Sequence, residues 1–187
     1  LRLPVDEEGV VVTARAFLPN GSASRPRSAR FAKTSLRPAT TIDAERLSGG
    51  MRYAYYEVEV SSVDELAGHQ PAREGIAQAV SLQGFERDER FGLVLDGYIR
   101  APADGVYTFY LTSDDGSKLT IGEETVVDHD GYHGASTKQG MIALQAGYHP
   151  ITVRFFQGGG GRGLRLAVAR GDRGKREEAS GWLFHRR

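Results

Sequence analysis

Two adjacent aspartates, Asp114 and Asp115, are the residues in this sequence whose spacing most directly suggests metal chemistry. Consecutive side chains of a strand point to opposite faces, and neighbouring carboxylates repel each other. A hard cation such as Ca²⁺ removes that repulsion and takes roughly six to eight oxygen ligands. The segment 113–117, Ser-Asp-Asp-Gly-Ser, is also typical of a turn that needs no metal. Spacing alone leaves a calcium site and a simple turn as alternatives.

A second polar cluster spans residues 128–133, with the sequence Asp-His-Asp-Gly-Tyr-His. His129 and His133 are four residues apart, a spacing that aligns two metal ligands on a helix, whereas Gly131 favours a loop. The two interpretations are a loop that contacts a metal or ligand and a polar connection between strands. Tyr132 and His133 each combine a flat ring with a hydrogen-bonding tip, which suits contact with a polar ligand.

Signatures of common catalytic sites are absent from the sequence. It contains no Gly-x-Ser-x-Gly elbow, no phosphate-binding loop and no His-Glu-x-x-His motif. Asp and Glu are numerous, but no pair of them lies in the apolar pattern that tunes two carboxylates for glycosidic-bond cleavage. Cysteine is absent, which excludes disulfides, thiolate nucleophiles and cysteine–zinc sites. We therefore expect a non-catalytic chain, with no catalytic residue.

The polar clusters stand among short segments with the period-2 alternation of β-strands. Glycine-rich turns separate these segments, and residues 62–65, Ser-Val-Asp-Glu, match a capping box that predicts one short helix near 63–67. Regular short strands without a long helical pattern predict an all-β fold, an antiparallel β-barrel or sandwich. The predicted strands are 51–58, 91–100, 106–112, 118–121, 125–127, 139–144, 149–157 and 164–169.

Three tyrosines lie in the first of these predicted strands. Alternation places Tyr53 and Tyr55 on one face and Tyr56 on the other. At least one of them is therefore expected in the core, and the alternative is an exposed aromatic platform.

The first 33 residues form a separate predicted unit. Residues 10–17 alternate as a strand, and the Pro-Asn-Gly-Ser sequence at 19–22 signals a β-hairpin, because Asn and Gly tolerate positive φ. Two strands alone are marginally stable. We therefore expect residues 1–33 to be an incomplete β module that packs on preceding sequence or on the next domain, followed by a linker at 34–41 and a larger domain at 42–187.

Composition is ordinary for a soluble globular protein. The 187 residues are 40% hydrophobic and 26% charged, and 24 basic residues balance 24 acidic ones at a pI near 7.2. This balance provides no overall field that would attract nucleic acid or anionic lipid. No apolar run approaches the roughly 20 residues needed to span a bilayer. We therefore expect neither a nucleic-acid partner nor a membrane span.

A series of motifs carries a resemblance to a known family. In order they are FGLVLDGYI at 91–99, GVYTFY at 105–110, SDDGSKL at 113–119, VVD at 126–128 and LQAGYHPI at 144–151. Taken together, the region 42–185 resembles the protective-antigen-type (PA-14-type) domain, a β-barrel or sandwich module of bacterial glycosidases, fungal adhesins and bacterial toxins.

The resemblance implies a specific calcium site. In the adhesin branch of that family, a cis peptide joins an Asp-Asp pair and turns both carboxylates toward one Ca²⁺, whose open coordination positions bind vicinal sugar hydroxyls. The implied metal ligands in this sequence are the side chains of Asp114, Asp115 and Gln157 and the carbonyls of Gly159 and Gly161. The implied sugar-contacting residues are Gly160 and Arg162, with Tyr132 and His133 at the border of the site. The adhesin loop carries an aromatic residue that glycines replace here.

A shorter similarity concerns the first unit. Its VTARAF at 12–17 and SARF at 28–31 resemble the end of a chitobiase/β-hexosaminidase C-terminal β module. The pairing of the two modules is similar to the C-terminal region of secreted bacterial β-N-acetylhexosaminidases and related glycosidases.

The implied function is a non-catalytic carbohydrate-binding accessory module. Its expected partners are a glycan and the catalytic domain of a parent glycosidase, and its expected location is secreted, periplasmic or on the bacterial cell surface. The alternative is a structural scaffold that supports or shapes the parent's active site without binding sugar.

Overall fold

The computed structural model describes residues 8–171 and 174–187. The chain divides into two compact units, Leu1–Ser35 and Leu36–Arg187. The start of the predicted N-terminal module, residues 1–7, lies outside the described residues.

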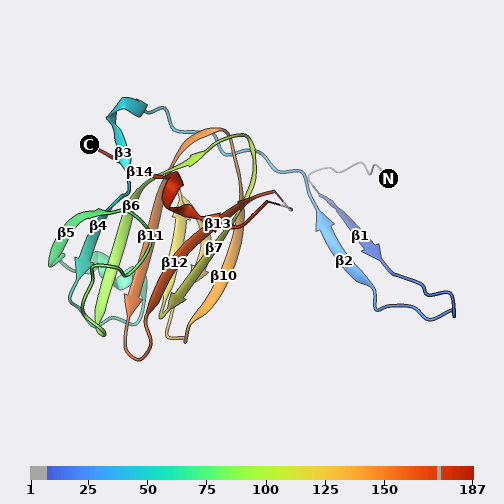
Figure 1. Cartoon of the computed structure of the whole chain (residues 1–187), viewed down its shortest axis with the longest axis horizontal. Helices are drawn as coiled ribbons and strands as arrows, with labels where there is room; N and C mark the ends of the chain where they lie inside the picture. Colours follow the sequence, from blue (N-terminus) through green and yellow to red (C-terminus); the bar gives the residue numbers. More distant parts are fainter. Residues whose placement is uncertain (1–7, 172–173) are drawn as a thin grey trace. The chain divides into compact units, whose positions relative to one another are not determined.

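The first unit is a β-hairpin, as predicted. Strand β1 (Val10–Ala14) pairs antiparallel with β2 (Arg27–Phe31) (Figure 1). The turn forms where the Asn-Gly signal lies, because the Leu18 amide donates to the Ser22 carbonyl at 2.8 Å and the Ser22 amide donates to Asn20 Oδ1 at 3.0 Å.

The second unit consists of β-strands and three short 3₁₀ helices among the described residues. Across that part of the chain, none of the helices has the length and apolar character needed to traverse a bilayer. The elements are η1 (Ala44–Arg46), β3 (Leu47–Gly49), β4 (Met51–Tyr56), η2 (Val63–Gly68), β5 (Arg73–Ala77), β6 (Phe91–Ala101), β7 (Gly105–Asp114), β8 (Ser117–Ile121), β9 (Glu124–His129), β10 (Ser136–Leu144), β11 (Gly147–Gln157), β12 (Gly163–Arg170), β13 (Glu177–Glu178), η3 (Ala179–Trp182) and β14 (Leu183–Arg186).

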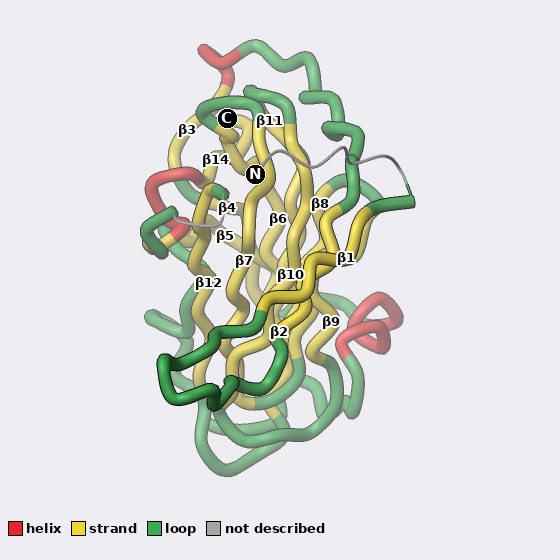
Figure 2. Tube along the Cα trace, turned by 90° about the vertical axis from the view of Figure 1, so that its right-hand side faces the viewer, coloured by secondary structure: helices red, strands yellow, loops and turns green. Residues whose placement is uncertain are grey.

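Two antiparallel sheets pack as a sandwich (Figures 1 and 2). The smaller sheet has the order β10-β7-β12-β13, and the larger has the order β3-β14-β6-β11-β8-β9, with β4 paired to β6 and β5 paired to β4. Over the described residues the sheets do not close into a barrel. Of the two architectures predicted from the sequence, the sandwich is the one that forms.

The core lies between the two sheets. Alternation along each strand sends every second side chain inward, so β7 buries Tyr107, Phe109 and Leu111 against side chains of β6 and β11. The predicted division of the tyrosines is confirmed: Tyr53 and Tyr55 join this core, while Tyr56 packs on the outer face of the larger sheet.

Helix η2 covers part of that outer face. Its Leu66 is buried with Phe156 of β11 in a small second cluster. Gly92 of β6 permits the close approach, since a Cβ at that position would lie 2.2 Å from Leu66 Cδ2. The short helix predicted at 63–67 is thereby confirmed, as a 3₁₀ rather than an α-helix.

The predicted capping box is half formed. Ser62 Oγ accepts a hydrogen bond from the Asp64 amide at 3.3 Å, as an N-cap does. The reciprocal bond is absent, since Glu65 Oε1 instead accepts from Ser61 Oγ at 2.8 Å.

The segment expected to be a linker packs on the second unit from Leu36 onward. The Arg37 amide donates to the Ala143 carbonyl at 2.7 Å, and the Thr40 amide donates to the Tyr148 carbonyl at 2.8 Å. These bonds place Arg37 and Thr40 alongside β10 and β11, where they form isolated bridges.

Candidate functional site

One end of the sandwich brings the predicted metal ligands together. Strand β7 ends at Asp114 and β11 ends at Gln157, and Gly163 at the start of β12 is paired with Asp114. We call the connection between β11 and β12, residues 158–162, the glycine loop. It lies at the lower edge of the sandwich in Figure 1. The β7–β12 pairing and the short connection from β11 to β12 therefore bring the carboxylates, the amide and the loop to one place.

Asp115 is a buried carboxylate that holds two loops. It is only 6% exposed and is joined to Asp114 by a cis peptide bond, as the family resemblance implied. Its Oδ1 accepts a hydrogen bond from the His133 amide at 3.1 Å, and its Oδ2 accepts one from the Gly158 amide at 3.0 Å. These charge-assisted bonds fix the glycine loop against the β9–β10 loop.

Gln157 is buried beside Asp115 with one polar atom unsatisfied. Its side-chain Nε2 donates to the Gly161 carbonyl at 2.8 Å and to the Gly159 carbonyl at 3.2 Å. The two carbonyls therefore converge on one amide group. Gln157 Oε1 is buried and has no hydrogen-bond partner within the described residues. An orphaned acceptor of this kind costs roughly 1–3 kcal/mol.

Glycines let the loop approach its neighbours closely. A Cβ on Gly161 would lie 2.9 Å from Asp114 Oδ2, so the carboxylate reaches the loop backbone there. A Cβ on Gly158 would lie 2.3 Å from Tyr132 Cε1, so the tyrosine ring rests on the loop. Gly160 faces open space with φ of +82°, a conformation that favours glycine.

The donor set has the chemistry of a hard-cation site. Two aspartate carboxylates, one amide oxygen and two loop carbonyls are all oxygen ligands of the kind that Ca²⁺ takes. In the described ranges, no group of three or more His, Cys, Asp or Glu side chains is arranged to hold a metal ion. The predicted set contains only two such side chains, since its other donors are an amide and backbone carbonyls.

Tyr132 presents an exposed ring beside the glycine loop. The side chain is 61% exposed, and its ring packs edge-to-face on Phe156 with 5.3 Å between centroids. Its hydroxyl donates to the Val60 carbonyl at 3.2 Å. The ring is therefore held in place while part of its surface faces solvent.

The two histidines of the cluster stack on each other, His129 at the end of β9 and His133 in the loop that follows. The ring centroids of His129 and His133 are 3.9 Å apart with 11° between planes. The ring nitrogens of His133 contact the carbonyls of His129 and Gly134, each at 3.0 Å. The loop conformation predicted from Gly131 is confirmed. Burial, with smaller contributions from His133 and Lys138, lowers the pKa of His129 below its ordinary value.

Asp130 anchors this loop, a role that the sequence analysis did not assign. Its carboxylate accepts from Ser62 Oγ at 2.6 Å, from the Val63 amide at 3.0 Å and from the Gly131 amide at 2.9 Å. The Asp-Gly dipeptide is a local signal for the turn. The contacts with η2 depend on a segment almost 70 residues away, so no local pattern could reveal them.

Arg162 ties the glycine loop to segment 85–88. Its guanidinium donates to the Phe85 carbonyl at 2.8 Å and to the Arg87 carbonyl at 2.7 Å, and it lies 3.4 Å from Asp88 Oδ1. The structure thus places Arg162 at the predicted site, with its guanidinium engaged by the neighbouring segment. That segment also brings Glu89, which the sequence analysis did not single out, next to Gly159.

Comparisons with known proteins concern the second unit. The family model described as the PA14 domain matches residues 50–182. A search of curated proteins gave no match.

Several solved structures share the fold. The PA14 sugar-binding domain from an RTX adhesin is 20% identical, with 73% of this chain and 98% of that chain covered and a TM-score of 0.64. The A domain of epithelial adhesin 9 from Candida glabrata, in complex with Galβ1-3GlcNAc, is 12% identical, with 82% and 97% covered and a TM-score of 0.65. A β-glucosidase from Kluyveromyces marxianus, in complex with glucose, is 16% identical, with 65% and 15% covered and a TM-score of 0.52.

Because the sequence identities to these structures are 20% or lower, the similarities establish a shared fold and no shared function. The family model matches well over half of the chain, and the sheets and the β7 and β11 ends described above lie within the matched region. This chain therefore belongs to the PA14 domain family.

Proposed function

We propose that this chain is a non-catalytic carbohydrate-binding module whose glycan site lies at the glycine loop and depends on Ca²⁺. The observation that carries the proposal is the buried, unpartnered Oε1 of Gln157 beside two converging carbonyls. The residues that would hold the ion are Asp114, Asp115, Gln157, Gly159 and Gly161.

The proposal depends on the side-chain amide of Gln157. Its NH₂ group donates hydrogen bonds to the two loop carbonyls, so the partial positive charge of its hydrogens faces both carbonyl oxygens. Rotation of the amide by about 180° would turn Oε1 toward the same point, since O and N of an amide are alike in shape. Oε1 would then join the two carbonyls as a third oxygen ligand of the cation. The positive charge of the cation would replace the partial positive charge of the NH₂ group.

Bound Ca²⁺ would offer open coordination positions to a pair of sugar hydroxyls. The exposed Tyr132 ring would contact an apolar face of the sugar, a common use of aromatic side chains. Gly160 faces open space, so the loop leaves room for a ring to approach. Arg162 and His133 would keep the surrounding loops in position, with their hydrogen bonds to segment 85–88 and to Asp115.

The comparisons support the ligand class. One fold neighbour is named as a sugar-binding domain and another is in complex with Galβ1-3GlcNAc. This chain also matches 15% of a β-glucosidase, which supports a wider proposal that the module accompanies the catalytic domain of a glycosidase. We propose that this parent enzyme resembles a β-N-acetylhexosaminidase. A secreted, periplasmic or cell-surface location in bacteria belongs to the same proposal.

Thermal unfolding of the full chain with EDTA and then with Ca²⁺ tests the metal site. Binding to the native state at 100 times Kd adds about 2.7 kcal/mol, which corresponds to roughly 5–11 °C in Tm for a domain of this size. Asp115→Asn should abolish the shift. Asp43→Asn, which changes an exposed N-cap aspartate at η1, should retain it. An absent shift in the wild type would refute the calcium site.

Glycan binding is then measured by calorimetry, beginning with Galβ1-3GlcNAc and a panel of neutral oligosaccharides. We expect binding that EDTA removes and Ca²⁺ restores. Saturable binding that survives complete removal of calcium would overturn the metal-dependent mechanism while leaving the carbohydrate-binding module intact. A calcium shift without any glycan binding would overturn the function instead.

A further inference from the structure

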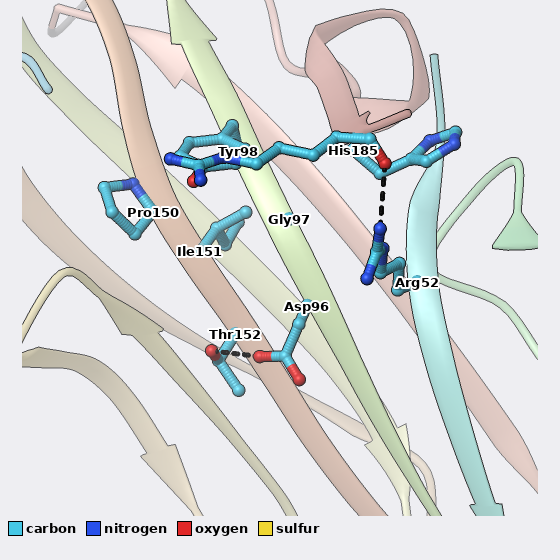
Figure 3. Close-up of a pocket in the computed structure, with 9 residues that line it drawn as sticks. Arg52, Asp96, Gly97, Tyr98, Pro150, Ile151, Thr152 and His185 are labelled. Atoms are coloured by element: carbon cyan, nitrogen blue, oxygen red, sulfur yellow. Dashed lines mark hydrogen bonds between the residues drawn. The ribbon is translucent and has the colours of Figure 1, made fainter. Parts of the chain in front are cut away.

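A pocket far from the glycine loop lies on the outer face of the larger sheet, where β6 changes its partner (Figure 3). Strand β4 pairs with β6 as far as Asp96, which faces Arg52. Strand β14 takes over the same edge from Tyr98, which faces Phe184. The pocket has a volume of about 270 Å³ and is lined by residues on both sides of this junction. We call it the β6 pocket.

The β6 pocket is built by the backbone of the sheet. A Cβ on Gly97 would lie 2.4 Å from the Phe184 carbonyl oxygen, so glycine permits the approach of β14. Arg52 Nη2 donates to the Arg186 carbonyl at 3.2 Å and thus bridges β4 to β14 across the junction. Strand pairing on both sides therefore fixes the pocket without the help of a loop.

One end of the β6 pocket is polar. Asp96 faces Arg52 across one strand pair and Thr152 across the other, so the three side chains form one row on the outer face. The Cβ atoms of residues directly opposite each other lie roughly 4.5–5.5 Å apart. Asp96 Oδ1 accepts a hydrogen bond from Thr152 Oγ1 at 2.5 Å. A carboxylate, a hydroxyl and a guanidinium therefore stand side by side.

The carboxylate and the guanidinium of this row are neighbours that do not pair. Arg52 forms no ion pair with any described residue, and its one hydrogen bond, to the Arg186 carbonyl, leaves other N–H groups of the guanidinium open. Asp96 Oδ2 accepts no hydrogen bond from the described part of the chain. The row thus offers a free acceptor beside free donors.

The other end of the β6 pocket is apolar. Tyr98 and Pro150 face each other in the next row of the same face, which lies roughly 7 Å from the row of Asp96. The Arg186 guanidinium belongs to this end, since it lies 5.6 Å from the centre of the Tyr98 ring. Figure 3 shows Asp96 and Thr152 at one end of the pocket, with Tyr98 and Pro150 toward the other.

We propose that the β6 pocket binds one ring of a neutral sugar without calcium. A hydroxyl group both donates and accepts hydrogen bonds. Two adjacent hydroxyls of the sugar can therefore donate to Asp96 Oδ2 and accept from Arg52. The C–H groups of the ring then lie toward Tyr98 and Pro150, where an aromatic ring supplies apolar surface. A sugar ring has the same division into a hydroxyl edge and an apolar face as the pocket.

The mixed charge of the pocket selects a neutral ligand. Asp96 would repel a carboxylate or sulfate at the polar end, and Arg52 would repel an amine there. A purely apolar ring would leave the row of Asp96 without hydrogen-bond partners. Small-molecule sites usually enclose roughly 300–1,000 Å³, so a pocket of about 270 Å³ suits a single sugar ring.

This site is separate from the glycine loop. Phe91 of β6 is paired with Gln157, and Tyr98 lies seven residues further along the same strand. At about 3.3 Å per residue, the two places are roughly 23 Å apart. They share no residue, so the proposal does not depend on calcium or on the glycan site proposed above.

The test is an amide chemical-shift titration of the full chain in EDTA. The probes are the methyl glycosides of glucose, galactose and N-acetylglucosamine. The references are glycine, which is a zwitterion, and cyclohexanol, which has an apolar ring with a single hydroxyl. We expect at least one sugar to shift the amides of Gly97, Tyr98 and Thr152 in a saturable way, with a much weaker response to both references.

Two variants remove the polar end of the pocket. Asp96→Ala and Arg52→Ala should each weaken sugar binding at least tenfold, and both should fold because the two side chains are exposed. The matched controls are Glu123→Ala, in the exposed turn between β8 and β9, and Arg100→Ala, on the same face of β6. Both controls should bind the sugar as the wild type does.

Three results would overturn the proposal. The first is no saturable shift of these amides with any of the sugars, and the second is an equal response to glycine or cyclohexanol. The third is unchanged affinity in Asp96→Ala or in Arg52→Ala. Asp115→Asn should retain this binding, and Asp96→Ala should retain the calcium-dependent rise in Tm, so the failure of the calcium site and the failure of the β6 pocket are distinguishable.

Discussion

Replacement of Asp130 by alanine should destabilise the domain through one carboxylate that touches no proposed ligand. Three donors lose their acceptor: Ser62 Oγ and the amides of Val63 and Gly131. Each bond contributes roughly 0.5–1.5 kcal/mol, so the loss of all three amounts to about 3 kcal/mol. For a domain of this size, Tm should fall by roughly 6–12 °C.

The same substitution should also release the β9–β10 loop from η2. The loop carries Tyr132 and the His133 amide that bonds Asp115, so glycan affinity should fall as well. Thermal unfolding and glycan calorimetry measure the two effects. The matched control is Asp128→Ala, because Asp128 is exposed, its ion pair with Lys118 is long, at 3.8 Å, and it accepts a single long hydrogen bond, from the Asp130 amide at 3.3 Å. If Asp130→Ala lowered Tm no more than this control does, the anchoring role would be wrong.

Two further predictions concern the packing of η2 and the response to pH. Gly92→Val should cost about 1–3 kcal/mol, because its side chain would overlap the leucine of η2; Gly49→Val, which meets open space, is the control in urea unfolding. Burial lowers the pKa of His149 below its ordinary 6.5, so the unfolded chain binds that proton more tightly. The contribution of neutral His149 to the free energy of unfolding is present above pH 6.5, and it is lost as the pH falls toward the lowered pKa of the folded state. The free energy of unfolding, measured in urea at pH values from 7.5 to 5.5, should fall less steeply with pH in His149→Gln than in the wild type. An equal pH dependence in the two proteins would contradict this assignment.

The long strands were predictable because their signal is local, whereas the short strands β3, β5, β13 and β14 were not predicted. Alternation of buried and exposed residues marks β6, β7 and β11, and each end of these strands lies within two residues of its predicted position. The hairpin of the first unit follows from Asn-Gly in the same way. In both cases the residues that decide the structure are neighbours in the chain.

The site was predictable only in part, because its parts are distant in the sequence. The Asp114–Asp115 pair was visible by itself, but its neighbour Gln157 entered through the family resemblance. The ends of β7 and β11 belong to different sheets, and they meet only because β12, which follows β11 through the glycine loop, pairs with β7. The carbonyls that Arg162 binds, those of Phe85 and Arg87, lie about 75 residues earlier in the chain. The segment around them has no sequence motif that would indicate the contact. Spacing rules cannot identify contacts of this kind.

The scaffold alternative and the binding module differ in what they require at the end of β11. A scaffold needs only a well-packed strand end, and an apolar side chain would meet that need without an unsatisfied group. Two other buried polar side chains at this end of the sandwich do satisfy each other: Ser113 and Ser117 share a 2.7 Å hydrogen bond. Within the described residues, the other buried side-chain atoms without partners are histidine ring nitrogens, so Gln157 Oε1 is the single oxygen among them. The amide group that carries it faces two loop carbonyls through Nε2, and rotation of that amide would turn Oε1 toward the same point, where a cation would satisfy it. This arrangement favours binding over support.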